Sequence, residues 1–442
     1  MFKKQPKKEP LQSLKGMRDI RDEEYYKYQG FFEKAQEVAV YYGFKPIETP
    51  TMEHEEVFTG GVGIGTDIVD KEMYAFRTKS GERVAMRPEG TAPVVRSYIE
   101  HGMQSLPQPV MLYYYGPFFR HDNPQKGRLR ELRQFGFEII GTDKSIADAI
   151  VIKLTMLVLE EAGAKNLCID INSIGDKECR PQYVRKLMSY YRKHINQICN
   201  TCRQRMKENP LRVLDCKDPK CQIIKEKAPD SISYLCNTCQ KHLKEVLEYL
   251  EEMQISYKLN KNLVRGLSYY TRTVFEISEY SGAEENPSSE FCPRDGGGLA
   301  IAGGGRYDYL AKKLGSKKDV PAVGVAIGVD RVISAPWYTL LAPKIIKKPK
   351  IYFIQFGAEA KLKSINIIEM LRKAKISIDQ SLSKDSLTAQ LAIAEKLNIP
   401  YVIIFGQKEA LENSVIIRNM TNRFQETVSI PKLLEYLKEN AK

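Results

Sequence analysis

Two apolar, aromatic segments enclose a strongly basic loop between Tyr113 and Gly141, where the sequence reads YYYGPFFRHDNPQKGRLRELRQFGFEIIG. The segments predict two antiparallel strands, and NPQKG between them is typical of a turn, because proline fixes one backbone dihedral and glycine permits a positive one. Planar guanidinium groups bind phosphate in a bidentate manner, so a basic loop held on a sheet suits a polyphosphate. A charge run that serves only solubility is the alternative. The basic residues are Arg120, Lys126, Arg128, Arg130 and Arg133.

The second of these segments adds a feature that a solvated loop lacks. Strand alternation places Gln134 and Glu138 on one face, with Gly136 between them. An amide and a carboxylate with no side chain between them leave room for a small ligand that carries an amine or a cation. The sequence therefore predicts a binding pocket beside the basic loop.

The composition is that of a soluble globular protein of two or three domains, since 43% of the 442 residues are hydrophobic and 28% are charged. No apolar run reaches the length of a membrane span, and no signal-peptide core follows the lysine-rich start, so we expect a cytoplasmic protein. Residues 1–13 predict a disordered basic tail. The net charge of +13 favours a polyanionic partner such as RNA.

Residues 119–138, FRHDNPQKGRLRELRQFGFE, resemble motif 2 of class II aminoacyl-tRNA synthetases in the version found in histidyl-tRNA synthetases. A helix from Asp22 followed by KPIETPTME similarly resembles motif 1, which implies a homodimer. VPAVGVAIGVDRVI resembles motif 3, which implies that Arg331 contacts the terminal phosphate of ATP. Asp122 and Asp330 stand where the family has glutamate.

A glutamate and a threonine stand where a strand turns into a helix, in the segment RPEGT. Such a corner can orient an ammonium group, and an ordinary helix cap by Thr91 is equally compatible with it. RPEGT resembles the segment that binds the amino group of histidine in this family. The resemblance therefore assigns Glu89, Gly90 and Thr91 to the amino acid.

The segment RGLSYY resembles the family's histidine-specific motif RGLDYY, with Ser268 in place of the aspartate. Arg265 can bridge a carboxylate and an α-phosphate while a phenol bonds a ring nitrogen. We expect Tyr269 and Tyr270 to alternate in a strand, with Tyr270 facing the pocket, although adjacent tyrosines in strands are more often core residues. The motif AGGGRYDYL predicts a strand, a glycine turn and a helix, and its resemblance to AGGRYDGL adds Arg306 and Tyr307 to the pocket.

The resemblance implies a histidine–tRNA ligase that uses ATP-Mg²⁺ and tRNA(His), with specified residues in each role. The catalytic residues are Arg265, Arg120 and Gln134. The histidine-binding residues are Glu89, Gly90, Thr91, Gln134, Glu138, Arg265, Tyr269, Tyr270 and Tyr307, and the ATP-binding residues are Arg120, Asp122, Arg128, Arg130 and Arg331. Two alternatives remain open: a non-catalytic histidine-binding regulator of histidine biosynthesis, and a structural RNA-binding protein.

Six of the nine cysteines fall within residues 176–255, which predict a polar helical insertion. Two C-x-x-C pairs have the ligand spacing of a four-thiolate zinc site, and we assign them as Cys199, Cys202, Cys236 and Cys239. The further pair, Cys216 and Cys221, could replace either one. Free buried thiols are the alternative.

The remaining segments complete the expected fold. Residues 14–335 form an α+β catalytic domain with an antiparallel sheet, in which Ser145 caps a helix and Asp148 takes the capping-box position. Residues 336–349 are rich in proline and lysine and predict a linker. Strands alternate with helices over residues 350–442, which predicts an α/β domain with a mostly parallel sheet. This domain resembles the anticodon-binding domain of related synthetases.

Overall fold

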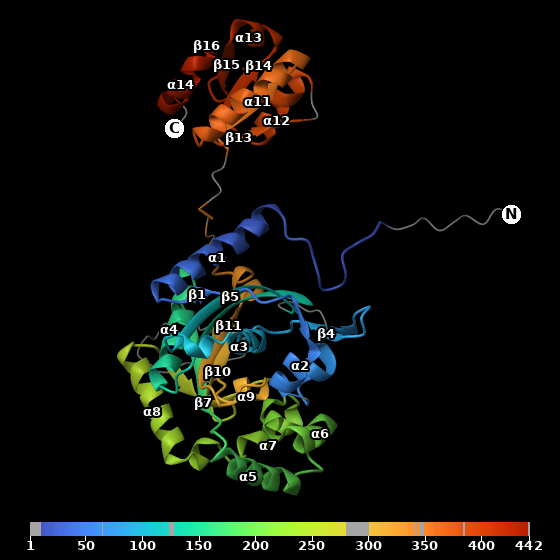
Figure 1. The fold of residues 1–442 in the computed structure, drawn as a ribbon, viewed down its shortest axis with the longest axis vertical. Coiled ribbons are helices and arrows are strands. Elements are labelled where there is room, and N and C mark those ends of the chain that lie inside the picture. The colour runs from blue at the N-terminus through green and yellow to red at the C-terminus, as the bar shows by residue number, and fades with distance from the viewer. Residues whose placement is uncertain are drawn as a thin grey trace, which may run out of the picture. The chain divides into compact units, whose positions relative to one another are not determined.

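The computed structural model describes residues 10–63, 65–122, 128–279, 300–339, 341, 343–344, 349–382 and 385–440. The chain divides into two compact units, Met1–Pro343 and Lys344–Lys442. Each unit is built around a large sheet of its own (Figure 1). The predicted turn NPQKG, and residues 1–9 of the predicted tail, lie outside the described residues.

The first unit contains an eight-stranded sheet in the order β1-β5-β6-β11-β10-β9-β7-β8. The two outermost pairs, β1 with β5 and β7 with β8, are parallel, and every pair between them is antiparallel. The strands are β1 (Lys45–Pro46), β5 (Val110–Phe119), β6 (Glu131–Ile140), β7 (Leu167–Ser173), β8 (Tyr257–Leu259), β9 (Thr271–Glu279), β10 (Ala302–Arg306) and β11 (Ala322–Gly328).

Helices α1 (Asp22–Tyr41) and α4 (Ser145–Glu161) pack against one face of this sheet, as Figure 1 shows. Strand alternation sends Tyr113, Phe135 and Phe137 to this face, where they form a core with Phe31 and other helical side chains. The apolar character of α4 nearly all round its circumference agrees with this burial. Helix α4 begins at Ser145 as expected, but its N-cap residue is Lys144 and has no side-chain cap.

Smaller elements cover the other face. They include a three-stranded sheet in the order β2-β4-β3, made of β2 (Met52–His54), β3 (Ala75–Arg77) and β4 (Arg83–Met86). The short helix α10 (Val329–Ile333) packs with α1 on the first face. The short helices on the second face are α2 (Glu55–Phe58), α3 (Thr91–Glu100) and α9 (Leu310–Lys313). Leu112 and Tyr114 of β5 point to this face, one residue out of phase with Tyr113. The polar residues of β6 also lie here.

The polar insertion consists of four helices, α5 (Arg180–Lys193), α6 (Asn200–Glu208), α7 (Pro219–Glu226) and α8 (Asn237–Glu252). Beyond residue 335 the chain stays packed on the first unit: the backbone amide of Thr339 donates to the carbonyl of Ala162 at 2.9 Å, and Trp337 contacts the core. The expected linker therefore overlaps the first unit in its first eight residues, up to Pro343.

The second unit has a five-stranded sheet in the order β13-β12-β14-β15-β16. The first three strands in this order are parallel to one another. Strand β15 is antiparallel to β14, and β16 is antiparallel to β15, which gives the mixed sheet of an α/β domain. The strands are β12 (Ile351–Gln355), β13 (Ile378–Gln380), β14 (Tyr401–Phe405), β15 (Ser414–Asn419) and β16 (Gln425–Ser429), and the helices are α11 (Ala358–Lys373), α12 (Leu387–Lys396), α13 (Gln407–Glu412) and α14 (Leu433–Asn440).

Two local predictions are wrong. Strand β9 begins at Thr271, so Tyr269 and Tyr270 precede the strand and do not alternate within it. The glycines of the AGGGR segment lie inside strand β10 and not in a turn, because neighbouring backbone and side chains fill the space that side chains would need there. Among the described helices, none is both long and apolar enough to cross a membrane.

Candidate active site

A cavity of about 300 Å³ opens on the sheet face that carries the polar residues of β6. Its floor is one row of sheet residues that are paired from strand to strand across β5, β6, β11, β10 and β9: Tyr114, Gly136, Ala326, Gly303 and Glu276. The three central residues of this row are small and the two outer ones are large. The row therefore forms a trough with Tyr114 at one end and Glu276 at the other.

The trough depends on glycine at two positions. A Cβ atom added to Gly136 would lie 2.2 Å from Cζ of Tyr114, and one added to Gly303 would lie 2.6 Å from Nη1 and Nη2 of Arg265. Real Cβ atoms essentially never come this close to other heavy atoms. Each glycine thus lets a large side chain lie directly on the sheet backbone.

Most of the predicted site residues line this cavity. Arg120, Asp122, Arg128 and Arg331 lie in it together with the corner residues and the RGLSYY residues. Four predicted residues are not among the lining residues: Glu138, Tyr307, Arg306 and Arg130. The lining set from the predictions is Glu89, Gly90, Thr91, Arg120, Asp122, Arg128, Gln134, Arg265, Tyr269, Tyr270 and Arg331.

Glu89, and not Thr91, caps helix α3. Its carboxylate accepts from the backbone amides of Thr91 at 2.8 Å and Ala92 at 2.9 Å, and from the Tyr269 hydroxyl at 3.3 Å. Burial raises the pKa of Glu89 by more than the bonds from Ala92 and Thr91 lower it. The hydroxyl of Thr91 is directed instead to Glu138, at 2.7 Å.

Glu138 is fully buried beneath the cavity and not on its wall. It accepts hydrogen bonds from Thr91 and from the hydroxyl of Tyr307, which is also buried. Burial raises the pKa of Glu138 to about 8, and these two bonds offset only part of the rise. In this structure Glu138 and Tyr307 support the residues that line the pocket.

Several arginines line the same cavity. Burial and the neighbouring guanidinium groups of Arg120 and Arg128 lower the pKa of Arg331. Arg120 donates to the carbonyl of Pro88 at 2.8 Å, and Arg128 donates to Asp122 at 3.1 Å. Like charges held this close repel one another, so the arrangement favours a multiply charged anion between them.

Arg130 is turned out of the cavity. Its Nε donates to the carbonyl of Asp122 at 3.2 Å, and its backbone amide donates to the carbonyl of Gly16 at 2.8 Å. These two bonds brace the segment that carries Arg128.

Arg265 lies between the arginine side and the carboxylate side. Its guanidinium pairs with Glu276 and lies 6.0 Å from the ring centroid of Tyr270. Three buried polar atoms among the lining residues have no hydrogen-bond partner within the described chain, namely Nε of Arg265, Oε1 of Gln134 and the hydroxyl of Tyr114. Buried polar atoms are nearly always paired in folded proteins, so these atoms point to a polar ligand.

Asp330 holds the arginine-bearing helix α10 in place. Its carboxylate accepts from the hydroxyl of Tyr28 and from the backbone amide of Arg133, each at 2.5 Å. These bonds tie α10 to helix α1 and to strand β6. The aspartate at this position, where the family has glutamate, therefore makes two hydrogen bonds despite its shorter side chain.

Three polar side chains that line the cavity were not foreseen from the sequence: Tyr114, Glu276 and Glu72. Tyr114 lies directly opposite Gly136 in the hairpin, so counting back from the predicted turn could have found it. Glu276 and Arg265 are separated by eleven residues and meet only through the fold. Glu72 ends an irregular helical segment, Ile68–Glu72, for which periodicity offers no signal.

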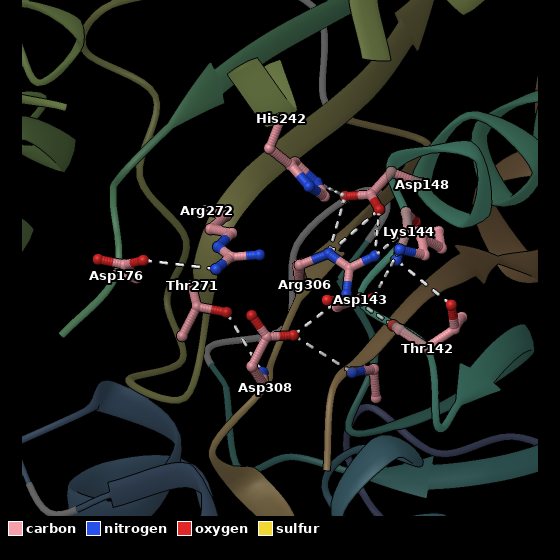
Figure 2. A network of polar contacts seen from close by, with 11 residues as sticks. Thr142, Asp143, Lys144, Asp148, Asp176, His242, Thr271, Arg272, Arg306 and Asp308 are labelled. Carbon is pink, nitrogen blue, oxygen red and sulfur yellow. Dashed lines mark hydrogen bonds and ion pairs between the residues drawn. The ribbon is translucent and has the colours of Figure 1, made fainter. Parts of the chain in front are cut away.

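Arg306 does not enter the cavity, contrary to the expectation. Its Nη2 and Nε bond the Asp148 carboxylate at 2.5 and 3.1 Å, and Nη1 bonds Asp308 at 3.1 Å (Figure 2). The carbonyls of Thr142 and Lys144 accept the remaining N–H groups at 2.9 and 3.0 Å. All of its donors are used within the protein, so none is left for a ligand.

Asp148 receives a second partner, His242 of helix α8, at 3.2 Å (Figure 2). Burial alone would raise the pKa of Asp148, but Arg306 and His242 hold it below its usual value. Asp148 is thus a buried counter-ion, and the predicted capping-box role is wrong.

The predicted zinc ligands do not meet in one place. The sulphur atoms of Cys199 and Cys202 group with those of Cys216 and Cys221, whereas Cys236 and Cys239 group with Asp176 and Cys179. Cys236 and Cys239 lie at the start of α8, which packs on the core helix α4, so they are held apart from α6. The alternative in which Cys216 and Cys221 replace one pair agrees with the structure.

Comparison with known proteins places these features in a family. A family model described as histidyl-tRNA synthetase matches residues 16–332, and one described as an anticodon-binding domain matches residues 350–440. These matches confirm the predicted fold class, an α+β catalytic domain followed by an α/β anticodon-binding domain.

Individual relatives agree with the family models. A histidine–tRNA ligase of Thermodesulfovibrio yellowstonii is 40% identical over 96% of this chain and 97% of its own length. One from Dehalococcoides mccartyi is 39% identical over 97% of this chain and 99% of its own length. The crystal structure of apo S. aureus histidyl-tRNA synthetase matches with a TM-score of 0.76 at 30% identity, covering 97% of this chain and 100% of that one. The chain therefore belongs to the histidyl-tRNA synthetase family.

Proposed function

We propose that this protein activates histidine with ATP and transfers the histidyl group to tRNA(His). One observation carries the proposal: Arg120, Arg265 and Arg331 share a single cavity with the buried carboxylate side around Glu89. Activation is an in-line displacement at the α-phosphate, so positioning and charge neutralisation are what the protein must supply. The arginines neutralise the phosphate charge, and the trough positions the reactants.

On the phosphate side, Arg120 holds the α-phosphate and Arg331 the γ-phosphate, while Asp122 and Arg128 form an ion pair beside the nucleotide. Synthetases of this class use ATP and Mg²⁺. The carboxylates of Glu72 and Glu276 line the same cavity, and Mg²⁺ that arrives with ATP takes one or two carboxylates besides the phosphate oxygens. Arg130 supports the loop and does not contact the nucleotide.

On the amino-acid side, Glu89, Thr91 and Gln134 receive the ammonium group of histidine, with the unpaired Oε1 of Gln134 as one acceptor. The backbone of Gly90 leaves room for the Tyr114 ring. Tyr269 and Tyr270 border the imidazole, and Glu138 with Tyr307 sets its hydrogen bonding from below through Thr91. Arg265 bridges the histidine carboxylate and the α-phosphate, where its unpaired Nε is available.

Transfer requires tRNA, for which the net charge of +13 and the anticodon-binding domain over residues 350–440 are suited. A homodimer is also part of the proposal. Helix α1, which resembles motif 1, leaves Val40 57% and Tyr41 85% exposed at its end, and such apolar exposure suits burial against a second copy. A cytoplasmic location and a structural zinc ion in the insertion complete the proposal.

Histidine-dependent exchange of pyrophosphate into ATP tests activation, and charging of tRNA(His) tests transfer. We expect exchange with histidine and with none of the other nineteen amino acids, because a buried polar pocket rejects ligands that leave its groups unpaired. A folded chain that binds histidine without any exchange would establish the regulatory alternative. Salt-sensitive tRNA binding with neither reaction would establish an RNA-binding role.

A further inference from the structure

Four cysteines of the insertion form a compact group away from the active-site cavity. Their sulphur atoms, from Cys199, Cys202, Cys216 and Cys221, all lie within 4.8 Å of one another. Three of the four side chains are buried, and Cys199 is partly buried. The ligands come from the start of α6, from the residue after the helical turn Pro210–Asp215, and from α7.

The sulphur geometry is that of a metal site and not of a disulfide. Sγ of Cys199 lies 3.8 Å from Sγ of Cys216. A tetrahedral site with Zn–S bonds of about 2.3 Å places its sulphur atoms about 3.8 Å apart. A disulfide would need about 2.05 Å. The observed separation therefore matches an edge of a ZnS₄ tetrahedron.

Backbone amides point at two of these sulphur atoms. The amide of Cys202 donates to Sγ of Cys199 at 3.4 Å, and the amide of Cys199 donates to Sγ of Cys221 at 3.3 Å. Such bonds stabilise thiolates and orient them toward a metal. Neutral thiols would gain far less from them.

We propose that Cys199, Cys202, Cys216 and Cys221 bind one structural zinc ion per chain. The site joins α6 and α7, helices of nine and eight residues, which are too short to be stable without tertiary support. Zinc thus supplies the cross-link that this polar part of the insertion needs.

The second group, Asp176 with Cys179, Cys236 and Cys239, differs in one respect. Its carboxylate already accepts from the backbone amides of Glu178 and Cys179, at 3.0 and 3.4 Å, and lies 3.5 Å from Arg272. Asp176 therefore closes a turn. The cysteines of this group provide a matched control for those of the zinc site.

The zinc site also supports the active-site loop, an effect that rests on the proposed function. Arg212 lies between Cys202 and Cys216 and donates to the carbonyl of Gly266 at 3.2 Å. It also pairs with Asp67 at 2.5 Å, as does Arg205 of α6 at 3.2 Å. Gly266 follows Arg265 directly, so the metal-linked segment buttresses the backbone that carries this arginine.

Metal analysis of the chain purified without chelators tests the site. We expect one zinc per chain to be lost in the Cys216→Ser/Cys221→Ser variant and retained in the Cys236→Ser/Cys239→Ser variant. Fewer than about half a zinc per chain in the wild type, unchanged zinc in the first variant, or its loss in the second would each overturn the assignment.

Two measurements on the wild-type chain remain informative if the first variant does not fold. A chelator should make four further thiols reactive toward a thiol reagent, and added zinc should protect them again. Co²⁺ in place of zinc should show the sulphur-to-metal absorption of tetrahedral thiolate sites. No change in thiol reactivity, or no such absorption, would argue against the proposal, and neither readout depends on whether histidine is activated.

Discussion

The guanidinium group of Arg265 lies directly on the backbone of Gly303, where even one added carbon would approach Nη1 and Nη2 to 2.6 Å. Gly303 pairs with Glu276 on the neighbouring strand, and Glu276 binds the same guanidinium. The glycine sets the height of Arg265 above the sheet, and the glutamate sets its direction. The position of the central arginine is thus determined by the sheet register.

Replacing Gly303 by alanine should displace Arg265 without disturbing the sheet. We expect kcat/KM for histidine-dependent pyrophosphate exchange to fall by roughly 10²-fold, as small misplacements of a positioning group can do. Gly60→Ala is the control, since a Cβ there would meet only a carbonyl oxygen at 3.9 Å. Unchanged exchange in the folded Gly303→Ala variant would show that the arginine need not lie against the sheet.

Removing Arg265 should slow activation itself. The Arg265→Ala variant is expected to lose roughly 10²–10³-fold in the rate of pyrophosphate exchange, by analogy with the loss of a preorganised donor, or about 3 kcal/mol of barrier. Arg185→Ala, on the exposed face of α5, should leave the rate unchanged. A loss below about threefold would remove Arg265 from the proposed mechanism.

The pH dependence of stability should report on Glu138. Its pKa in the folded chain is about 8, above the ordinary 4.5, so the native state retains a proton that the unfolded chain releases. The stabilisation is complete below about pH 4.5 and is lost as the pH rises through 8. Glu89 acts in the same direction.

In Glu138→Gln this contribution disappears. The variant should therefore gain stability relative to the wild type between pH 5 and pH 9, by on the order of a few kcal/mol. The fluorescence of Trp337, the only tryptophan, follows unfolding of the first unit. The exposed Glu252→Gln change serves as the control. A constant difference between wild type and Glu138→Gln across this range would contradict a protonated native Glu138.

Breaking the buried ion pair of Figure 2 should be costly. Arg306→Ala leaves Asp148 buried without its main partner, and we expect a loss of about 3–5 kcal/mol in the free energy of unfolding of the first unit. Arg306→Met combined with Asp148→Leu should cost less than Arg306→Ala alone, because the fully buried charge of Asp148 is removed together with its main partner. Lys244→Ala, in the exposed part of α8, is the control. Equal losses in the single and double variants would argue against an uncompensated charge.

Local sequence patterns were sufficient to predict the strands and the corner on which the site is built. Alternation of apolar residues predicted the β5–β6 hairpin, and the polar triplet Gln134, Gly136 and Glu138 does share one face. The strand-to-helix corner at Glu89 was also predicted. In each case the determining contacts lie within a few residues of one another or across one turn.

Roles that depend on distant partners were not predictable. Arg306 stands in a glycine-rich motif that suggests a ligand, yet Asp148, 158 residues away, takes its donors. The pairs Cys199–Cys202 and Cys236–Cys239 have equal spacing in sequence, and only the packing of α8 on α4 decides which of them meets Cys216 and Cys221. Tyr269 and Tyr270 were placed in a strand because β propensity does not show where pairing begins.

Asp148 of α4 contacts His242 of α8, which lies 94 residues further along the chain, and Arg306 of β10, which lies 158 residues further. Closing loops of that size costs chain entropy before the contacts contribute any favourable free energy. Arg306 can shed its hydration only after both elements have docked. We therefore expect this cluster to form late in folding, and a chain with a misplaced insertion would lack the hydrogen bond between His242 and Asp148.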